Sequence, residues 1–188
     1  MMGKYYMKIF NMIFCLSLPL AIGGCTPPIM GEVNSAGIQQ AKFTSYFILD
    51  DADELGSLQI RQKTAQHIHE LMQDKGAAPA ENLQDAAQIV HYSYSVRPGQ
   101  YNIVHQDAAN SRATKGRKLG LFDKKCEFYQ HRLIIEIIDQ KNGELQYRGE
   151  ASEQHCDDNI EKNITILTNM AMSDFGAPKG KRISSRKK

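Results

Sequence analysis

The feature that most constrains the fold is a pair of alternating segments joined by a turn sequence. In residues 126–138 and again in residues 144–154, apolar side chains recur at odd positions, and in the first segment Gln130, Arg132 and Glu136 share the even face. Residues 139–143, between them, are rich in turn-forming types. Strict alternation is typical of strands with one buried face. These segments therefore predict a β-hairpin whose odd face packs in a core. The apolar odd positions are Tyr129, Leu133, Ile135, Ile137, Leu145, Tyr147 and Ala151.

The two ends of this hairpin carry Cys126 and Cys156, both on the even face. A five-residue loop would place them directly opposite each other, at a Cα separation that a disulfide accepts. A three-residue loop would leave them diagonal. We predict a Cys126–Cys156 disulfide. The rival interpretation is a metal site that adds His131 and His155, but His155 and Cys156 are adjacent and face opposite ways in a strand.

Other stretches show a clear periodicity. Residues 43–49 are aromatic and β-branched, which predicts a strand, and residues 88–96 alternate as a strand does. The proline and glycine within residues 97–100 suit a turn, so residues 101–105 are expected to return as a hairpin partner. Residues 57–75 place apolar side chains at three- and four-residue steps, which predicts a helix.

A last helix is expected over residues 157–173, where Asp158 and Glu161 form a start that resembles a capping box. The order of elements is then β-α-β-β-β-β-α. This order predicts an α+β fold of two layers, in which an antiparallel-rich sheet carries both helices on one face.

The first 25 residues resemble the signal peptide of a bacterial lipoprotein. Lys4 and Lys8 precede an uncharged apolar run at residues 9–20, which is too short to remain as a membrane-spanning helix. Small residues then lead to Cys25, and residues 22–25 resemble a lipobox. We expect residues 1–24 to be removed and Cys25 to carry acyl chains such as palmitate. More than one chain makes such an anchor stable.

A lipoprotein signal peptide has two consequences, one for the location of the protein and one for its cysteines. In enterobacterial lipoproteins, an aspartate directly after the lipidated cysteine favours the inner membrane. Thr26 stands at that position here, which favours the periplasmic face of the outer membrane. With Cys15 in the removed segment and Cys25 lipidated, Cys126 and Cys156 remain as a pair in an oxidising compartment.

The mature chain has the length of one domain with tails. We expect a lipidated cysteine and flexible tether at residues 25–41, an α+β domain at residues 42–176 and a basic disordered tail at residues 177–188. Without the signal and the last ten residues, 15 basic residues face 21 acidic ones. An acidic domain of this kind is not expected to bind nucleic acid.

A basic segment interrupts the predicted strands at residues 106–125. Its candidate contacts with an anionic partner, such as lipopolysaccharide phosphates, are Arg112, Lys115, Arg117 and Lys118. The alternative is a solvated loop without a partner, because a connection of this length is either mobile or functional.

Motifs of catalysis are missing from the sequence. It contains no nucleophile elbow, phosphate-binding loop, dinucleotide glycine pattern or zinc-protease motif. We therefore expect no enzymatic activity, no cofactor and no metal.

The mature pattern from about residue 42 to residue 175 resembles the DUF4136 family of bacterial lipoproteins. The residues that carry this resemblance are Tyr46-Phe47 and residues 71–76, 89–94, 133–139, 143 and 147–149. The family often has a tryptophan in its first strand, whereas this chain has none, and the basic loop and tail also depart from the family. The resemblance implies a fold and a place in the cell, but it supplies no catalytic residues.

These observations favour an outer-membrane-anchored periplasmic lipoprotein. The expected function is a non-enzymatic binding or accessory module whose partner is an envelope protein or an anionic lipid. The alternative is a periplasmic protein that binds a lipid or small molecule in a cleft between sheet and helices.

Overall fold

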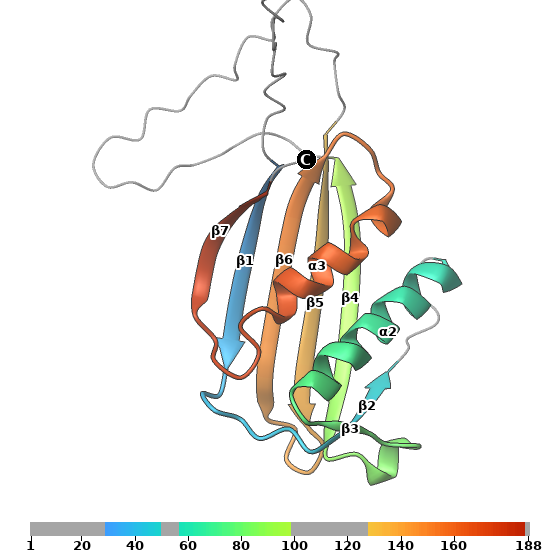
Figure 1. Cartoon of the computed structure of the whole chain (residues 1–188), viewed down its shortest axis with the longest axis vertical. Coiled ribbons are helices and arrows are strands. Elements are labelled where there is room, and N and C mark those ends of the chain that lie inside the picture. Colours follow the sequence, from blue (N-terminus) through green and yellow to red (C-terminus); the bar gives the residue numbers. More distant parts are fainter. Residues whose placement is uncertain (1–28, 50–56, 99–127, 187–188) are drawn as a thin grey trace, which may run out of the picture.

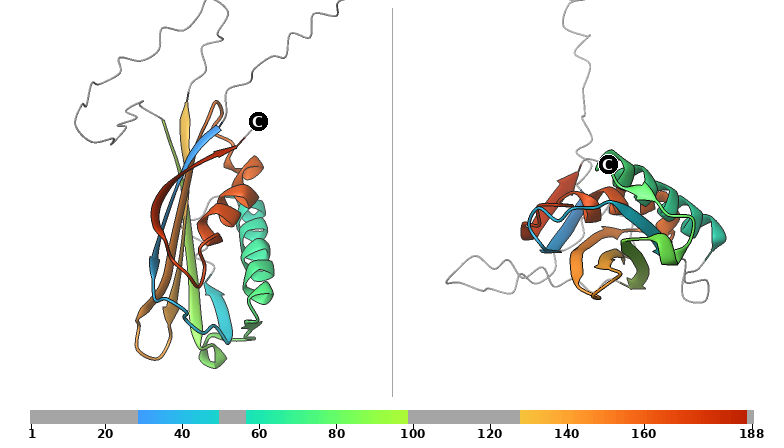
Figure 2. Two further views of the ribbon diagram at one scale, coloured as in Figure 1. Left: turned by 60° about the vertical axis from the view of Figure 1, so that its left-hand side comes forward. Right: turned by 90° about the horizontal axis from the view of Figure 1, so that it is seen from below.

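The computed structural model describes residues 29–49, 57–98 and 128–186, which form one sheet with two helices on one of its faces (Figures 1 and 2). The sheet has seven strands in the order β3-β2-β4-β5-β6-β1-β7. The strands are β1 (Ile29–Gly37), β2 (Ser45–Leu49), β3 (Ala78–Pro79), β4 (Gln88–Pro98), β5 (Tyr129–Asp139), β6 (Leu145–His155) and β7 (Gly180–Arg186). The helices are α2 (Leu58–Asp74) and α3 (Ile164–Met172), with 3₁₀ turns at Leu83–Asp85 and Ile160–Lys162.

The expected α+β class is confirmed, and the sheet is mixed. β2 runs parallel to β3 and β4, whereas the pairs β4–β5, β5–β6, β6–β1 and β1–β7 are antiparallel. Helix α2 supplies the crossover that parallel neighbours require. The core lies between the helices and the sheet face that they cover.

In the β5–β6 hairpin, most of the apolar residues at odd positions face the core as predicted. Leu133, Ile135 and Ile137 are fully buried, as are Tyr147 and Ala151 on the return strand. The turn uses neither of the two loops that the sequence suggested, but from Tyr129 to Ile137 the strands have the register that a three-residue loop would give, with Leu133 opposite Ala151. The Asp139 amide donates to the carbonyl of Glu144, and a bulge between Ile137 and Ile138 shifts the register of the rest of the hairpin.

Helix α2 also follows the prediction. The Ser57 side chain accepts from the Ile60 amide at the start, and the buried residues Thr64, Ile68 and Met72 recur at helical spacing. The last helix is shorter than expected. The Asn159 side chain accepts from the Glu161 amide and holds a 3₁₀ turn, so α3 begins only after it.

The expected tether at residues 25–41 is wrong for its described part, because β1 occupies Ile29–Gly37. This strand lies between β6 and β7 and pairs with both. Val33 and Ser35 face the covered side and are buried. Glycine at position 31 fits that side because a Cβ there would stand 2.9 Å from both Met170 Cε and the Ser152 carbonyl oxygen.

The expected disordered tail at residues 177–188 is also wrong for the residues that the structure describes. β7 pairs with β1 along its whole length and forms one edge of the sheet. Its basic side chains alternate between the two faces, and the arginines among them meet buried carboxylates.

The strand predicted at residues 88–96 pairs with a different strand from the one expected. β4 continues through Arg97 and Pro98, past the expected start of the turn, and pairs with β5 on one side. Residues 101–105, its expected partner, lie outside the described residues. Among the described residues, neither helix is long and apolar enough to span a bilayer.

Candidate functional site

Two carboxylates, Glu153 and Asp174, are buried on the helix-covered side of the sheet beside β7. Glu153 lies on β6, and Asp174 follows α3. A buried carboxylate is costly unless charged and hydrogen-bonded groups surround it. Each of these two receives an arginine from β7, Arg186 for Glu153 and Arg182 for Asp174.

Glu153 accepts hydrogen bonds from two neighbours. The Arg186 guanidinium donates to both carboxylate oxygens, with Nε–Oε1 2.8 Å and Nη2–Oε2 2.9 Å. His155 Nε2 lies 3.0 Å from Oε2. Burial raises the pKa of the Glu153 carboxyl, but the hydrogen bonds from His155 and Arg186 outweigh burial and lower that pKa to about 2. Glu153 is therefore ionised at neutral pH.

His131 lies against this group, with its ring centroid 4.6 Å from that of His155. Its Nε2 is 2.8 Å from the carbonyl oxygen of Asp157, which can only accept, so Nε2 carries the proton. Its Nδ1 lies 3.4 Å from the side-chain nitrogen of Asn163. Burial lowers the pKa of His131. The ring is therefore neutral and fixes the segment after β6.

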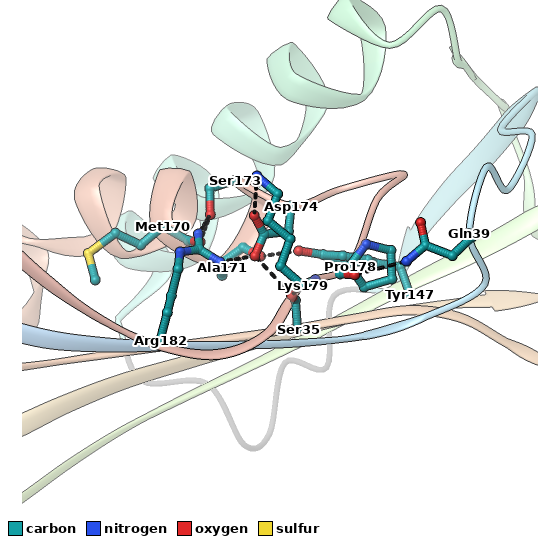
Figure 3. Close-up of polar contacts among 10 residues, drawn as sticks. All are labelled: Ser35, Gln39, Tyr147, Met170, Ala171, Ser173, Asp174, Pro178, Lys179 and Arg182. Carbon is teal, nitrogen blue, oxygen red and sulfur yellow. Dashed lines mark hydrogen bonds and ion pairs between the residues drawn. The ribbon is translucent and has the colours of Figure 1, made fainter. Parts of the chain in front are cut away.

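Asp174 occupies the centre of a second network (Figure 3). Ser35 of β1 donates to its Oδ2 at 2.9 Å, and Arg182 of β7 donates to the same oxygen. Lys179 Nζ lies 3.8 Å from Oδ1, and the Lys179 amide donates to the Ser35 hydroxyl. One buried carboxylate thus holds together β1, β7 and the segment after α3.

Both networks join a buried carboxylate to an arginine of β7, an arrangement that suits a structural role. Their carboxylates are committed to arginines, and His131 has hydrogen bonds at both ring nitrogens. Within residues 29–49, 57–98 and 128–186, no group of three histidine, cysteine, aspartate or glutamate residues is placed to hold a metal ion. We name the two pairs, Arg186–Glu153 and Arg182–Asp174, the β7 latch.

The outward face of β7 adds a further ion pair, Lys181 with Glu32 at 3.0 Å. Four of the six basic residues in the last ten are therefore paired with acidic groups of the domain. The sequence signal for the two arginine pairs was the spacing of Arg182 and Arg186, since residues four positions apart share one face of a strand. The four are Lys179, Lys181, Arg182 and Arg186.

A pocket lies at the other end of the sheet from the ends of β6 and β7. It is bounded by the chain before β2, by the residue that caps α2 and by the segment after α3. Its volume is about 580 Å³. The lining residues are Ala41, Lys42, Phe43, Thr44, Lys75, Phe175, Gly176 and Ala177.

Most of the site residues predicted from the sequence lie outside the described residues. These are Cys25, Cys126, Arg112, Lys115, Arg117 and Lys118. Cys156 follows β6 and is exposed. The opposed pair nearest to it is Tyr129 with His155, in the register that the bulge produces.

The disulfide remains a prediction with a direct test. Alkylation of the unreduced mature protein is expected to add no mass at Cys126 and Cys156, and alkylation after reduction is expected to label both. Closure of a loop of about 30 residues stabilises a fold by about 3 to 4 kcal/mol on the chain-entropy model. Two labelled thiols without reduction would contradict the pairing.

Comparison with known proteins finds similarity at the level of fold. No protein-family model matches the chain, and no curated protein matches it. The structure is similar to that of a PDZ domain protein from Parabacteroides distasonis, with a TM-score of 0.55 and 14% identity. That match covers 84% of this chain and 39% of the other, so this chain spans well under half of that protein.

Two further solved structures share less of the geometry. A PelC dodecamer from Paraburkholderia phytofirmans has a TM-score of 0.43 and 10% identity, over 78% of this chain and 99% of that one. A DUF4136 family protein from Bacteroides thetaiotaomicron has a TM-score of 0.42 and 13% identity, over 78% and 97%. A member of the family that the sequence resembles is thus among the similar structures, and neither match bears on function.

Proposed function

We propose that this protein is an outer-membrane-anchored periplasmic lipoprotein of the DUF4136 type that acts as a non-enzymatic binding or accessory module of the cell envelope. The observation that carries the proposal is the start of β1. Ile29 already belongs to the sheet, only four residues after the lipobox cysteine Cys25. Four residue steps reach at most about 14 Å. A lipid on Cys25 would therefore hold the folded domain against the membrane surface.

This short connection also gives the domain an orientation. Ile29 pairs with Arg186, and the same end of the sheet contains Pro98, Tyr129 and His155 (Figure 1). We expect this end to face the membrane, and we name it the membrane-proximal end.

The basic segment fits this orientation. The chain leaves β4 at Pro98 and enters β5 at Tyr129, and both residues lie at the membrane-proximal end. Arg112, Lys115, Arg117 and Lys118 stand between these points in the sequence. They are our proposed contacts with an anionic lipid or an envelope protein. Each basic side chain near an anionic surface contributes about 1 kcal/mol to membrane binding.

A non-enzymatic role is supported by what the buried polar groups contact. Among the described residues, the buried carboxyl and imidazole groups that a catalytic site would draw on are those of Glu153, Asp174, His131 and His155. All four belong to contacts that fasten β7 or the segment after β6, His155 through its hydrogen bond to Glu153. These contacts explain the groups as parts of the fold.

The test is a Cys25→Ala substitution in cells supplied with a labelled fatty acid. The native protein is expected to take up the label and to fractionate with the outer membrane, whereas the variant loses both properties. Cys15→Ala is the matched control, because it removes a cysteine from the segment expected to be cleaved and should keep both. Uptake of label by the Cys25→Ala variant, or an unlabelled native protein, would contradict the proposal.

A further inference from the structure

The pocket at the membrane-distal end has an apolar wall made by two aromatic rings. The centroids of Phe43 and Phe175 are 4.1 Å apart. Phe175 is buried and also meets the ring of Tyr147 edge-on at 5.3 Å. Because Tyr147 belongs to the core, this wall is held in place before any ligand arrives.

Two lysines are the charged residues among the lining side chains. Lys42 precedes Phe43, and Lys75 caps the end of α2; both are exposed. Neither makes an ion pair in the part of the chain that the structure describes, unlike Lys63 and Lys181, which pair with glutamates. Asp74 adjoins Lys75 in sequence but does not line the pocket.

The end of helix α2 presents fewer free carbonyl groups to this pocket than an uncapped helix would. Free carbonyl groups give a helix C-terminus a partial negative charge. Here the Met72 carbonyl accepts from the amides of Lys75 and Ala77, and the Gln73 carbonyl accepts from that of Gly76. The Met72 and Gln73 carbonyl groups are therefore satisfied, and the charged side chains that line the pocket are those of the two lysines.

We propose that this pocket binds an amphipathic monocarboxylate, whose apolar body lies on Phe43 and Phe175 and whose carboxylate lies between Lys42 and Lys75. The volume suits a small organic molecule, since ligand pockets are about 300 to 1,000 Å³. The nine residues of β1 separate this end from the membrane-proximal end by about 30 Å. The ligand is therefore taken from the periplasmic solution. The binding site itself goes beyond the proposed function, and only the source of the ligand rests on the orientation proposed there.

The experiment is a calorimetric titration of the purified mature protein in nanodiscs with 4-phenylbutyrate, a short water-soluble aromatic carboxylate. Empty nanodiscs supply the blank. We expect a saturable heat from one site. A Lys42→Glu/Lys75→Glu variant is expected to bind at least tenfold more weakly, and so is the native protein with the uncharged amide of the same acid.

The matched control is Lys141→Glu/Lys162→Glu, which makes the same change in net charge at exposed lysines outside the pocket. This variant is expected to bind as the native protein does, and equal thermal midpoints show that all three chains are folded. Absence of saturable binding at millimolar probe would overturn the proposal. So would equal affinity of the two double variants, or equal affinity for the acid and its amide.

Discussion

Replacing Arg186 with methionine is expected to lower the free energy of unfolding by about 3 kcal/mol at pH 7. The substitution keeps an apolar side chain of similar length but leaves the buried Glu153 carboxylate without its bidentate partner. Loss of one partner of a buried pair costs about 3 to 5 kcal/mol, and we take the lower value because Arg186 is 29% exposed. Urea unfolding followed by circular dichroism measures the change.

The loss is expected to depend on pH in a defined direction. The pKa of Glu153 falls from 4.5 to about 2 on folding, so its ionised form contributes stability above about pH 4.5 that is lost as the pH falls toward 2. Removal of Arg186 takes away one of the groups that lower this pKa. The difference between native and variant protein should therefore narrow from pH 7 to pH 3.

Lys181→Met is the matched control on the same strand. Lys181 points to the opposite face, where its pair with Glu32 is largely exposed, and such pairs contribute about 0 to 1 kcal/mol. Equal losses for Lys181→Met and Arg186→Met would show that β7 is not held by the latch. A loss for Arg186→Met that is the same at pH 7 and pH 3 would exclude the Glu153 charge as its cause.

The second large effect is expected at Gly149, where β6 passes under the end of α3. A Cβ at this position would lie 2.0 Å from the Ala171 carbonyl oxygen and 2.8 Å from the Tyr147 hydroxyl. That hydroxyl also donates to the Ala171 carbonyl at 2.5 Å. Gly149→Ala must therefore push α3 away from the sheet and disturb this hydrogen bond.

We expect Gly149→Ala to lower the free energy of unfolding by about 3 kcal/mol or more, at the upper end for overpacked cores. Gly143→Ala is the comparison, because that glycine has open space around it and only a positive φ of 71° to lose. Its cost should be about 1 to 2 kcal/mol. Thermal unfolding of both variants measures the difference. A Gly149→Ala protein as stable as Gly143→Ala would mean that α3 does not approach β6 this closely.

The sequence was sufficient where a segment carries its own periodicity. Alternation in residues 133–137 placed three side chains in the core, and α2 begins and ends within one residue of the helix predicted over residues 57–75. Both signals are local, because a strand or helix with one buried face repeats at its own period. The β6 half agreed at Tyr147 and Ala151, whereas Leu145, which pairs beyond the bulge, is exposed.

The two longer strands that the sequence analysis did not predict, β1 and β7, have weak local signals. β1 contains glycine at both Gly31 and Gly37 and has few β-branched residues, so its propensity resembles that of a linker. β7 is largely basic and polar. Each forms because of partners far away in sequence: β1 lies between β6 and β7, and the arginines of β7 meet Glu153 and Asp174. The amino-acid composition of β1 and β7 does not predict these long-range contacts.

The pocket could not be predicted for a related reason. Its wall joins Phe43 to Phe175, and its lysines come from positions 42 and 75, so three separate segments meet there. The sequence suggested a cleft between sheet and helices. In the structure that space holds the core, and the pocket lies at the end of the sheet.

The most direct test of the account is the mass of the N-terminal peptide of the mature protein, isolated from outer membranes after proteolysis. We predict a peptide that begins at Cys25 and carries the added mass of two or three acyl chains. Ile29, four residues later, would then start the sheet beside the membrane. An N-terminal peptide that begins elsewhere, or an unmodified Cys25 in it, would contradict the central claim that this residue anchors the domain.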